Sequence, residues 1–238
     1  MKVLRRNGET VEIGFEEKEG QKAFWHTSAH VLAQAVKRLY PETKCGVGPA
    51  IENGFYYDFA FSFSFAEEHL RAVEAQMRKI VRESLSLQVS RVSRQEAEDY
   101  MREQGEDYKL ELIRELPETE EISFFKQGEY VEFCAGPHIS NTSHIKAIKL
   151  LSVAGAYWKG QEGNKMLTRI YGISFPKASL LEEHLRMLEE ARLRDHRKLG
   201  RELGLFMLAE EGCGFPFVLP RGVILKNHLL DYWRRLHR

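Results

Sequence analysis

The sequence predicts an α+β fold in which helices pack on an antiparallel sheet. Alternating apolar segments recur in pairs around short turn sequences, which is typical of β-hairpins. Segments with helical apolar spacing are interspersed among these pairs. The chain has 238 residues, 43% of them hydrophobic, so it is long enough to bury a sizeable core.

The N-terminal elements follow from turn and stop residues. Residues 1–13 alternate around Asn7-Gly8 and predict a small hairpin. Residues 24–41 repeat apolar side chains at helical spacing, and Pro41 ends the predicted helix. A second hairpin is predicted for 45–61, with its turn in the sequence ENG.

Two capping patterns predict the next helices. Ser64 with Glu67 resembles a capping box that opens a helix through about Ser84. Ser93 with Glu96 predicts a second helix, which Gly105 closes.

Two further hairpins complete the predicted sheet. The sequence EISFFKQGEYVEFC predicts two short strands around Gln127-Gly128. The segments 145–160 and 164–175 predict a longer hairpin with a QEGN loop.

The character of the chain changes at Lys177. Residues 177–204 predict one long, charged linker helix with Leu181, Leu185 and Leu188 on one side. Residues 205–238 start a further domain that the chain does not finish, so we expect it to be part of a larger protein. The predicted organisation is therefore a remnant hairpin (1–20), a main domain (21–176), a linker helix (177–204) and a truncated domain (205–238).

Composition limits the function classes. The formal net charge is zero and the isoelectric point is near 7.1, so contacts with nucleic acid must come from local basic patches. Three scattered cysteines argue against a disulfide framework and for a reducing compartment. No apolar run approaches membrane-spanning length, and we expect a soluble, cytoplasmic protein without membrane contact.

Two matched pairs of side chains indicate a functional site. His26 and His30 share one face of a predicted helix, and Cys134 and His138 flank a bend at Gly136-Pro137. Three histidines and a cysteine are ligands of tetrahedral zinc, but the same side chains suit proton transfer to and from water. Taken alone, each of these residues is typical of a buried structural side chain. Together, the two matched pairs favour a single functional site.

Several motifs resemble one known family. The sequences HTSAHVLAQAVKRLYP, VGPAIENGFYYDF, EYVEFCAGPHI, AGAYWKG and NKMLTRIYG closely resemble the editing domain of bacterial threonyl-tRNA synthetases. RDHRKLGRELGLF and FPFVLPRG resemble the family's linker helix and the start of its class II catalytic domain. The resemblance runs from about residue 20 to the C-terminus.

The resemblance implies hydrolysis of the mischarged seryl ester on threonine tRNA. It implies a set of catalytic residues, namely His26, His30, Lys109, Cys134 and His138. Tyr57 and Glu132 complete the implied substrate-binding pocket, although family members often carry Asp at the position of Glu132. The implied partner is the seryl-charged 3′ end of threonine tRNA.

The resemblance also bears on cofactors and assembly. We expect no metal in catalysis; the alternative is zinc at His26, His30, Cys134 and His138, because related alanyl-tRNA editing domains hold zinc with this pattern. ATP and the zinc of the synthetic site belong to segments outside this chain, so no ligase activity is expected from it alone. We expect a monomer, and a homodimer for the full-length enzyme. The competing function is a zinc-stabilised tRNA-binding module without catalysis.

Overall fold

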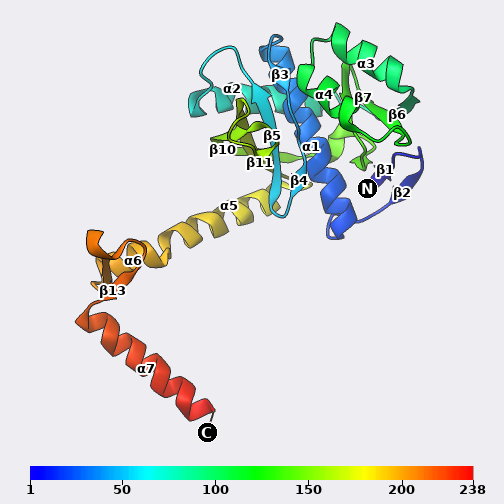
Figure 1. Cartoon of the computed structure of the whole chain (residues 1–238). Helices are drawn as coiled ribbons and strands as arrows, with labels where there is room; N and C mark the ends of the chain where they lie inside the picture. Colours follow the sequence, from blue (N-terminus) through cyan, green and yellow to red (C-terminus); the bar gives the residue numbers. More distant parts are fainter. Residues whose placement is uncertain (238) are drawn as a thin grey trace. The chain divides into compact units, whose positions relative to one another are not determined.

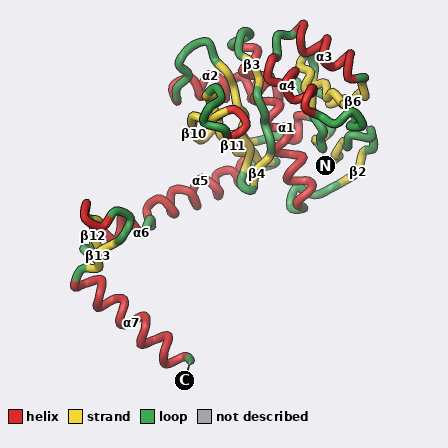
Figure 2. The backbone as a smooth tube through the Cα atoms, viewed as in Figure 1, coloured by secondary structure: helices red, strands yellow, loops and turns green. Residues whose placement is uncertain are grey.

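The computed structural model describes residues 1–237 and divides the chain into two compact units, Met1–Leu181 and Glu182–Arg238 (Figure 1). Figure 2 shows helices and strands interspersed along the first unit. All strand pairings in both units are antiparallel, which confirms the predicted mixture of antiparallel sheets and helices. The predicted division into four segments remains a prediction.

The first unit is built on a five-stranded central sheet. Its strands run in the order β10-β11-β5-β3, with β4 also paired to β5. The strands are β3 (Lys44–Cys45), β4 (Ala50–Ile51), β5 (Gly54–Ala60), β10 (Ala147–Tyr157) and β11 (Met166–Phe175). Helices α1 (Lys18–Leu39) and α2 (Glu67–Arg82) pack on this sheet and enclose the main apolar core, in which Phe24, Leu32 and Phe55 are fully buried.

A second layer has its own apolar cluster. It is a three-stranded sheet in the order β6-β7-β8, joined by two short helices. These elements are β6 (Leu87–Val92), α3 (Arg94–Glu103), α4 (Asp107–Glu115), β7 (Ile122–Gln127) and β8 (Tyr130–Phe133). Ile113 of α4 is fully buried against Met101 and Phe124, so this layer carries α4 as a separately packed element.

The N-terminal hairpin is part of the first unit. Strands β1 (Lys2–Leu4) and β2 (Thr10–Glu12) pair around Asn7-Gly8, and Gly8 has the positive φ of 86° that this turn requires. Strand β1 also pairs with β9 (His138–Ile139), with Leu4 opposite His138. A 3₁₀ turn, η1 (Thr142–His144), follows β9. The hairpin therefore supports the strand that carries a predicted site residue.

The second unit contains short elements and a final helix. After α5 (Ala178–Leu193), which begins in the first unit, come α6 (His196–Glu202), β12 (Phe206–Leu208), η3 (Glu210–Gly212), β13 (Pro216–Val218) and α7 (Pro220–Leu236). The prediction of one long helix over 177–204 is wrong. The Asp195 carboxylate accepts a hydrogen bond of 2.7 Å from the Arg197 backbone N–H, and this N-cap starts α6 as a new helix.

Of the two predicted capping boxes, one is correct. Ser93 and Glu96 cap α3 reciprocally, and Gly105 follows that helix with a φ of 68°. Ser64 does not cap α2, which begins at Glu67; instead His69 Nδ1 accepts a hydrogen bond of 3.1 Å from the Ala66 backbone N–H. Across residues 1–237, no helix combines the length and the apolar character needed to cross a membrane.

Candidate functional site

Three imidazoles meet between α1 and β9. His26 and His30 lie one turn apart on α1, with ring centroids 5.1 Å apart. The His138 ring lies 4.3 Å from that of His26 and 4.2 Å from that of His30. Strand β8 ends at Phe133, and the chain turns at Gly136, whose φ is 68°, through a cis Gly136-Pro137 bond to return as β9. This turn sets His138 beside the helix.

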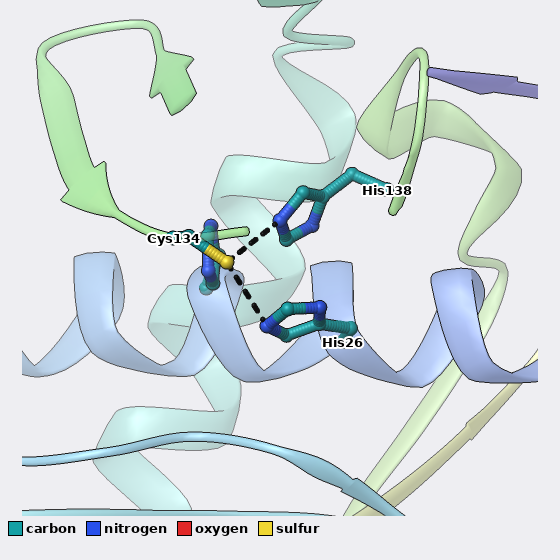
Figure 3. Close-up of side chains that lie close together, drawn as sticks. His26, Cys134 and His138 are labelled. Carbon is teal, nitrogen blue, oxygen red and sulfur yellow. Dashed lines mark hydrogen bonds between the residues drawn. The ribbon is translucent and has the colours of Figure 1, made fainter. Parts of the chain in front are cut away.

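Cys134 completes the cluster (Figure 3). Its Sγ lies 3.2 Å from His26 Nε2 and 3.3 Å from His138 Nε2. The Gly136 backbone N–H also donates to this sulfur, at 3.3 Å. One ligand atom from each of the four residues, His30 included, lies within 4.8 Å of the others. The two sequence pairs therefore form one cluster.

Hydrogen bonds fix the tautomer of His138. The Thr27 hydroxyl donates to the Ala23 carbonyl at 2.8 Å and accepts from the Ile139 backbone N–H at 2.9 Å. With its proton already used, Thr27 Oγ1 can only accept from His138 Nδ1, which lies 3.3 Å away. His138 therefore carries its proton on Nδ1 and presents the lone pair of Nε2 to the sulfur.

Burial keeps the cluster uncharged. It lowers the pKa of His26 to about 4, an effect that Glu132 and a hydrogen bond to the Pro137 carbonyl only partly oppose. Burial also lowers the pKa of His30 and of His138 well below the ordinary value. It raises the pKa of Cys134 to about 12, so the sulfur is a thiol at neutral pH.

A buried carboxylate organises the neighbouring side chains. Glu132 Oε2 accepts hydrogen bonds of 2.5 Å from the hydroxyls of Tyr57 and Tyr130, and Glu132 Oε1 pairs with Lys109 Nζ. Burial raises the pKa of both phenols well above the ordinary value, so both remain donors. Burial alone would lower the pKa of Lys109, but Glu132 outweighs it and raises the pKa, so Lys109 is a cation.

The two groups of residues face one cavity. It has a volume of about 320 Å³, and its lining includes His26, His30, Tyr57, Lys109, Glu132 and Cys134. His138, the seventh predicted residue, is fully buried behind this lining. Lys109 is the one cation among the lining residues. The cavity thus places a cation beside neutral imidazoles and a thiol.

The sequence prediction missed two supporting residues, Tyr130 and Thr27. Tyr130 stands two positions before Glu132 on β8, and such residues share one face of a strand, so alternation was an available signal. Thr27 adjoins His26 in sequence, but its role depends on the return of β9, which no local pattern indicates.

The donor set fits a zinc ion. Nε2 of His26 and Nε2 of His138 both lie within hydrogen-bond reach of Cys134 Sγ. In addition, His30 Nδ1 is buried without a hydrogen-bond partner among residues 1–237. Three imidazole nitrogens and a sulfur that lie within 4.8 Å of one another are the ligand types of a tetrahedral zinc site.

Comparisons with known proteins place part of this chain in a known domain family. Residues 122–171 match the family model of the threonyl and alanyl tRNA synthetase second additional domain, a segment that contains Glu132, Cys134 and His138. A threonine–tRNA ligase of Caldanaerobacter subterraneus subsp. tengcongensis is 57% identical over 234 residues, covering 98% of this chain and 36% of the ligase. That of Clostridium novyi is 57% identical over 237 residues, covering 100% of the chain and 37% of the ligase.

A third relative, the threonine–tRNA ligase of Clostridioides difficile, is 59% identical over 224 residues, which cover 94% of this chain and 35% of the ligase. The chain thus spans little more than a third of the curated relatives that it matches. By sequence, the chain is similar over almost its whole length to the threonine–tRNA ligases, and its residues 122–171 match the second additional domain of threonyl and alanyl tRNA synthetases.

Proposed function

We propose that this chain edits mischarged threonine tRNA by hydrolysing the ester that joins serine to the 3′ end. Serine lacks one methyl group of threonine, and a synthetic pocket loses only about 1–3 kcal/mol of binding by that difference. This discrimination is too small for accurate translation, so a second, hydrolytic site supplies the remainder. One observation carries the proposal: a buried cation and a cluster of neutral proton acceptors line the same small cavity.

The proposed reaction is a direct attack by water. A water oxygen attacks the ester carbonyl carbon and passes a proton to an imidazole of the cluster, while the carbonyl electron pair becomes an oxyanion. Lys109 stabilises this oxyanion as a fixed cation in a buried site. Collapse of the tetrahedral intermediate breaks the bond to the ribose oxygen, which takes the proton, and releases serine and uncharged tRNA.

The lowered pKa of His26 favours the second proton transfer, from the ring to the leaving oxygen, and makes the neutral ring a weaker base in the first. At neutral pH its ring is neutral, and its nitrogen lone pair can accept a proton from water. Once protonated, a ring with a pKa of about 4 is a strong acid and readily gives the proton to the departing ribose oxygen. We assign His30 and His138 to holding this ring and the water in place.

Cys134 acts in this scheme as a hydrogen-bonding group. Its raised pKa leaves little thiolate at neutral pH, and thiolate is the nucleophilic form of cysteine. Hydrolysis by water also needs no acyl-enzyme. Tyr57 and Glu132 are the proposed substrate-binding groups, with Glu132 holding Lys109 in its charged form.

Zinc gives the second candidate function. His26, His30, Cys134 and His138 would hold the ion, which when bound acts as a Lewis acid toward water or a carbonyl. With four protein ligands, however, the coordination would be closed, as in structural zinc sites. That convergence of four donors favours a zinc-stabilised tRNA-binding module without its own catalysis.

The decisive experiment is deacylation of seryl-tRNA and threonyl-tRNA, both on threonine tRNA, by the purified chain. We expect rapid, selective release of serine that persists after treatment with a chelator. Intact seryl-tRNA at saturating protein would refute the editing function, and loss of activity that returns only with added zinc would refute the metal-free scheme. We propose no ligase activity for this chain alone, and sedimentation should show a monomer.

A further inference from the structure

Helix α4, which carries Lys109, has two chemically different faces. Ile113 on one face is fully buried in the apolar cluster of the second layer, with Leu110 and Leu116 packed beside it. The other face is acidic: Asp107, Glu111 and Glu115 recur every four residues and so form one stripe along the helix. The apolar face fixes α4 within its own layer. The acidic stripe contacts the central layer, which consists of the five-stranded sheet with α1 and α2.

The partners of these acids are three lysines of the central layer. Lys37 of α1 pairs with Glu106, just before α4, at 2.8 Å between Nζ and Oε1. Lys44 of β3 pairs with Asp107. Lys159 pairs with both Glu111 and Glu115, its Nζ lying 2.5 Å from Glu115 Oε1. All the acids belong to α4 and its N-cap, and all the bases belong to the central layer.

The C-terminal half of α4 is held by the tip of the β10–β11 hairpin. There the short turn η2 (Trp158–Gly160) follows β10. Trp158 is buried, its Nε1–H donates to Glu111 Oε2 at 3.1 Å, and its ring lies edge-on to that of Tyr108 at 4.8 Å. Lys159 has a φ of 55°, a left-handed conformation that is rare for a residue with a side chain. These contacts fix an unusual turn directly against α4.

Lys109 extends from the same helix into the proposed catalytic cavity. Its Nζ pairs with Glu132 and lies 5.4 Å from the centroid of the Tyr57 ring. Because a helix moves as a rigid element, the direction of Lys109 depends on how α4 is held at both ends. Glu106 holds the N-terminal end, where it also accepts a hydrogen bond of 2.7 Å from the Cys45 backbone N–H.

We propose that Trp158 and Lys159 are positioning residues for the hydrolysis: they hold α4 so that Lys109 lies beside the reacting carbonyl. The inference rests on the proposed editing function. Neither residue lines the cavity, so each acts through α4 and not on the substrate. Without this tip, α4 and its layer are held to the central layer by the N-terminal contacts alone, and Lys109 is fixed less firmly beside the cavity.

The test measures deacylation of seryl-tRNA by Lys159→Ala and Trp158→Phe, the second of which removes the indole N–H but keeps an aromatic ring. We expect kcat to fall about fivefold in each variant, the scale of a lost exposed ion pair or hydrogen bond, with KM little changed. Lys159→Arg should retain activity because it keeps the cation. Lys165→Ala is the matched control, since this exposed lysine of the same hairpin has no side-chain partner within residues 1–237.

A double-mutant cycle with Lys109→Ala distinguishes positioning from a general structural role. If Lys159 acts through Lys109, adding Lys159→Ala to Lys109→Ala should lower the residual rate no further. A further fivefold fall in that background would overturn the inference.

Hydrogen exchange of α4 provides a readout that does not depend on activity. Amides of 107–115 should exchange faster in Lys159→Ala than in the parent chain or in Lys165→Ala. Unchanged exchange would overturn the inference even in an active protein. Faster exchange in a chain that does not hydrolyse seryl-tRNA would instead show that the hairpin tip holds α4 and that the proposed function is wrong.

Discussion

Cys134 is the residue at which the two candidate functions differ most. Its sulfur contacts two imidazole nitrogens. Without metal, the thiol donates its one proton to one imidazole nitrogen, and the sulfur can accept a hydrogen bond from a second. With zinc, the thiolate and both nitrogens would be ligands. The two chemistries give opposite expectations for removal of the sulfur.

Replacement of Cys134 by Ala should lower the deacylation rate and leave the fold intact if water is activated by side chains alone. The sulfur lies at the cavity wall, so its loss removes little packing. The measurements are elemental analysis for zinc and deacylation kinetics, each before and after chelation.

His30→Ala is the companion variant. Loss of a zinc ligand weakens both the zinc affinity and the rate of deacylation, whereas loss of a contact to water lowers only the rate. Stoichiometric zinc that survives dialysis and is lost in both variants would contradict the metal-free scheme.

The histidine cluster also predicts how stability depends on pH. Burial lowers the pKa of His26 to about 4 in the folded state, against about 6.5 in the unfolded chain. The unfolded state therefore binds more protons between these values, and the free energy of unfolding decreases as the pH falls from 7 to 4. His26 alone contributes on the order of 2–3 kcal/mol, with His30 and His138 acting in the same direction.

Urea unfolding of chelator-treated protein at pH 7.5 and pH 5 tests this dependence. We expect a clear loss of stability at the lower pH and a smaller loss in His26→Gln. His228→Gln removes an exposed histidine of α7 and serves as the control, which should behave like the parent chain. Equal unfolding free energies at the two pH values would show that the cluster is not buried in its neutral form.

Single residues of the site differed in how far the sequence could predict them. His26 with His30, and Cys134 with His138, were recognisable because their spacing within one element matches a known use of those residue types. Lys109 followed only from the family resemblance, because its burial depends on how α4 packs against the central layer. Tyr130 shares a strand face with Glu132, but the hydrogen bond that gives it a role forms only in the folded chain.

At the scale of elements, the loop between β3 and β4 shapes the cavity. A Cβ on Gly48 would lie 2.1 Å from Tyr57 Cδ2, and Tyr57 is itself fixed by its hydrogen bond to Glu132 and by stacking on Phe59. Neither ring nor loop can move freely, so the close approach requires a glycine.

Gly48→Ala should therefore displace Tyr57 or the loop, with a cost of about 1–3 kcal/mol in the free energy of unfolding and a raised KM for seryl-tRNA. Thermal unfolding and deacylation kinetics measure the two effects. Gly163→Ala is the matched control, because a Cβ there has no atom within 4 Å. A Gly48→Ala protein with parental stability and KM would mean that Tyr57 is not held as the structure indicates.

Local patterns predicted most elements but not their interruptions. The hairpins and the α3 cap were correct because the turn glycines and the Ser93–Glu96 pair act within a few residues. The helix expected over 177–204 is interrupted at Asp195. The helical apolar spacing continues through this position and so predicted one helix, but the Asp195 side chain caps the start of a new helix. The predicted Ser64 cap was wrong because α2 begins only after Ala66. There the Ala66 backbone N–H donates its hydrogen bond to His69 Nδ1.

For the whole molecule, the balance of charge limits how strongly the chain could bind tRNA under the proposed function. Lysines and arginines number 35, as do aspartates and glutamates, and many of them pair with one another, as along α4. A chain with no net charge gains little from the field of the nucleic acid as a whole. Under the proposed function, contact with tRNA would therefore depend on a few local phosphate contacts and on the cavity proposed to take the 3′ end.

We accordingly expect weak, salt-sensitive binding of threonine tRNA, with a Kd above about 1 µM at physiological salt. Each phosphate contact releases counterions, so the logarithm of the binding constant should fall linearly with the logarithm of salt concentration, with a slope set by a small number of contacts. Titration of labelled tRNA at several salt concentrations measures both quantities. A tRNA for another amino acid is the control and should bind about equally well, because phosphate contacts do not depend on sequence. Tight binding that persists at high salt and distinguishes the two tRNAs would contradict the charge argument and indicate a recognition surface that reads bases.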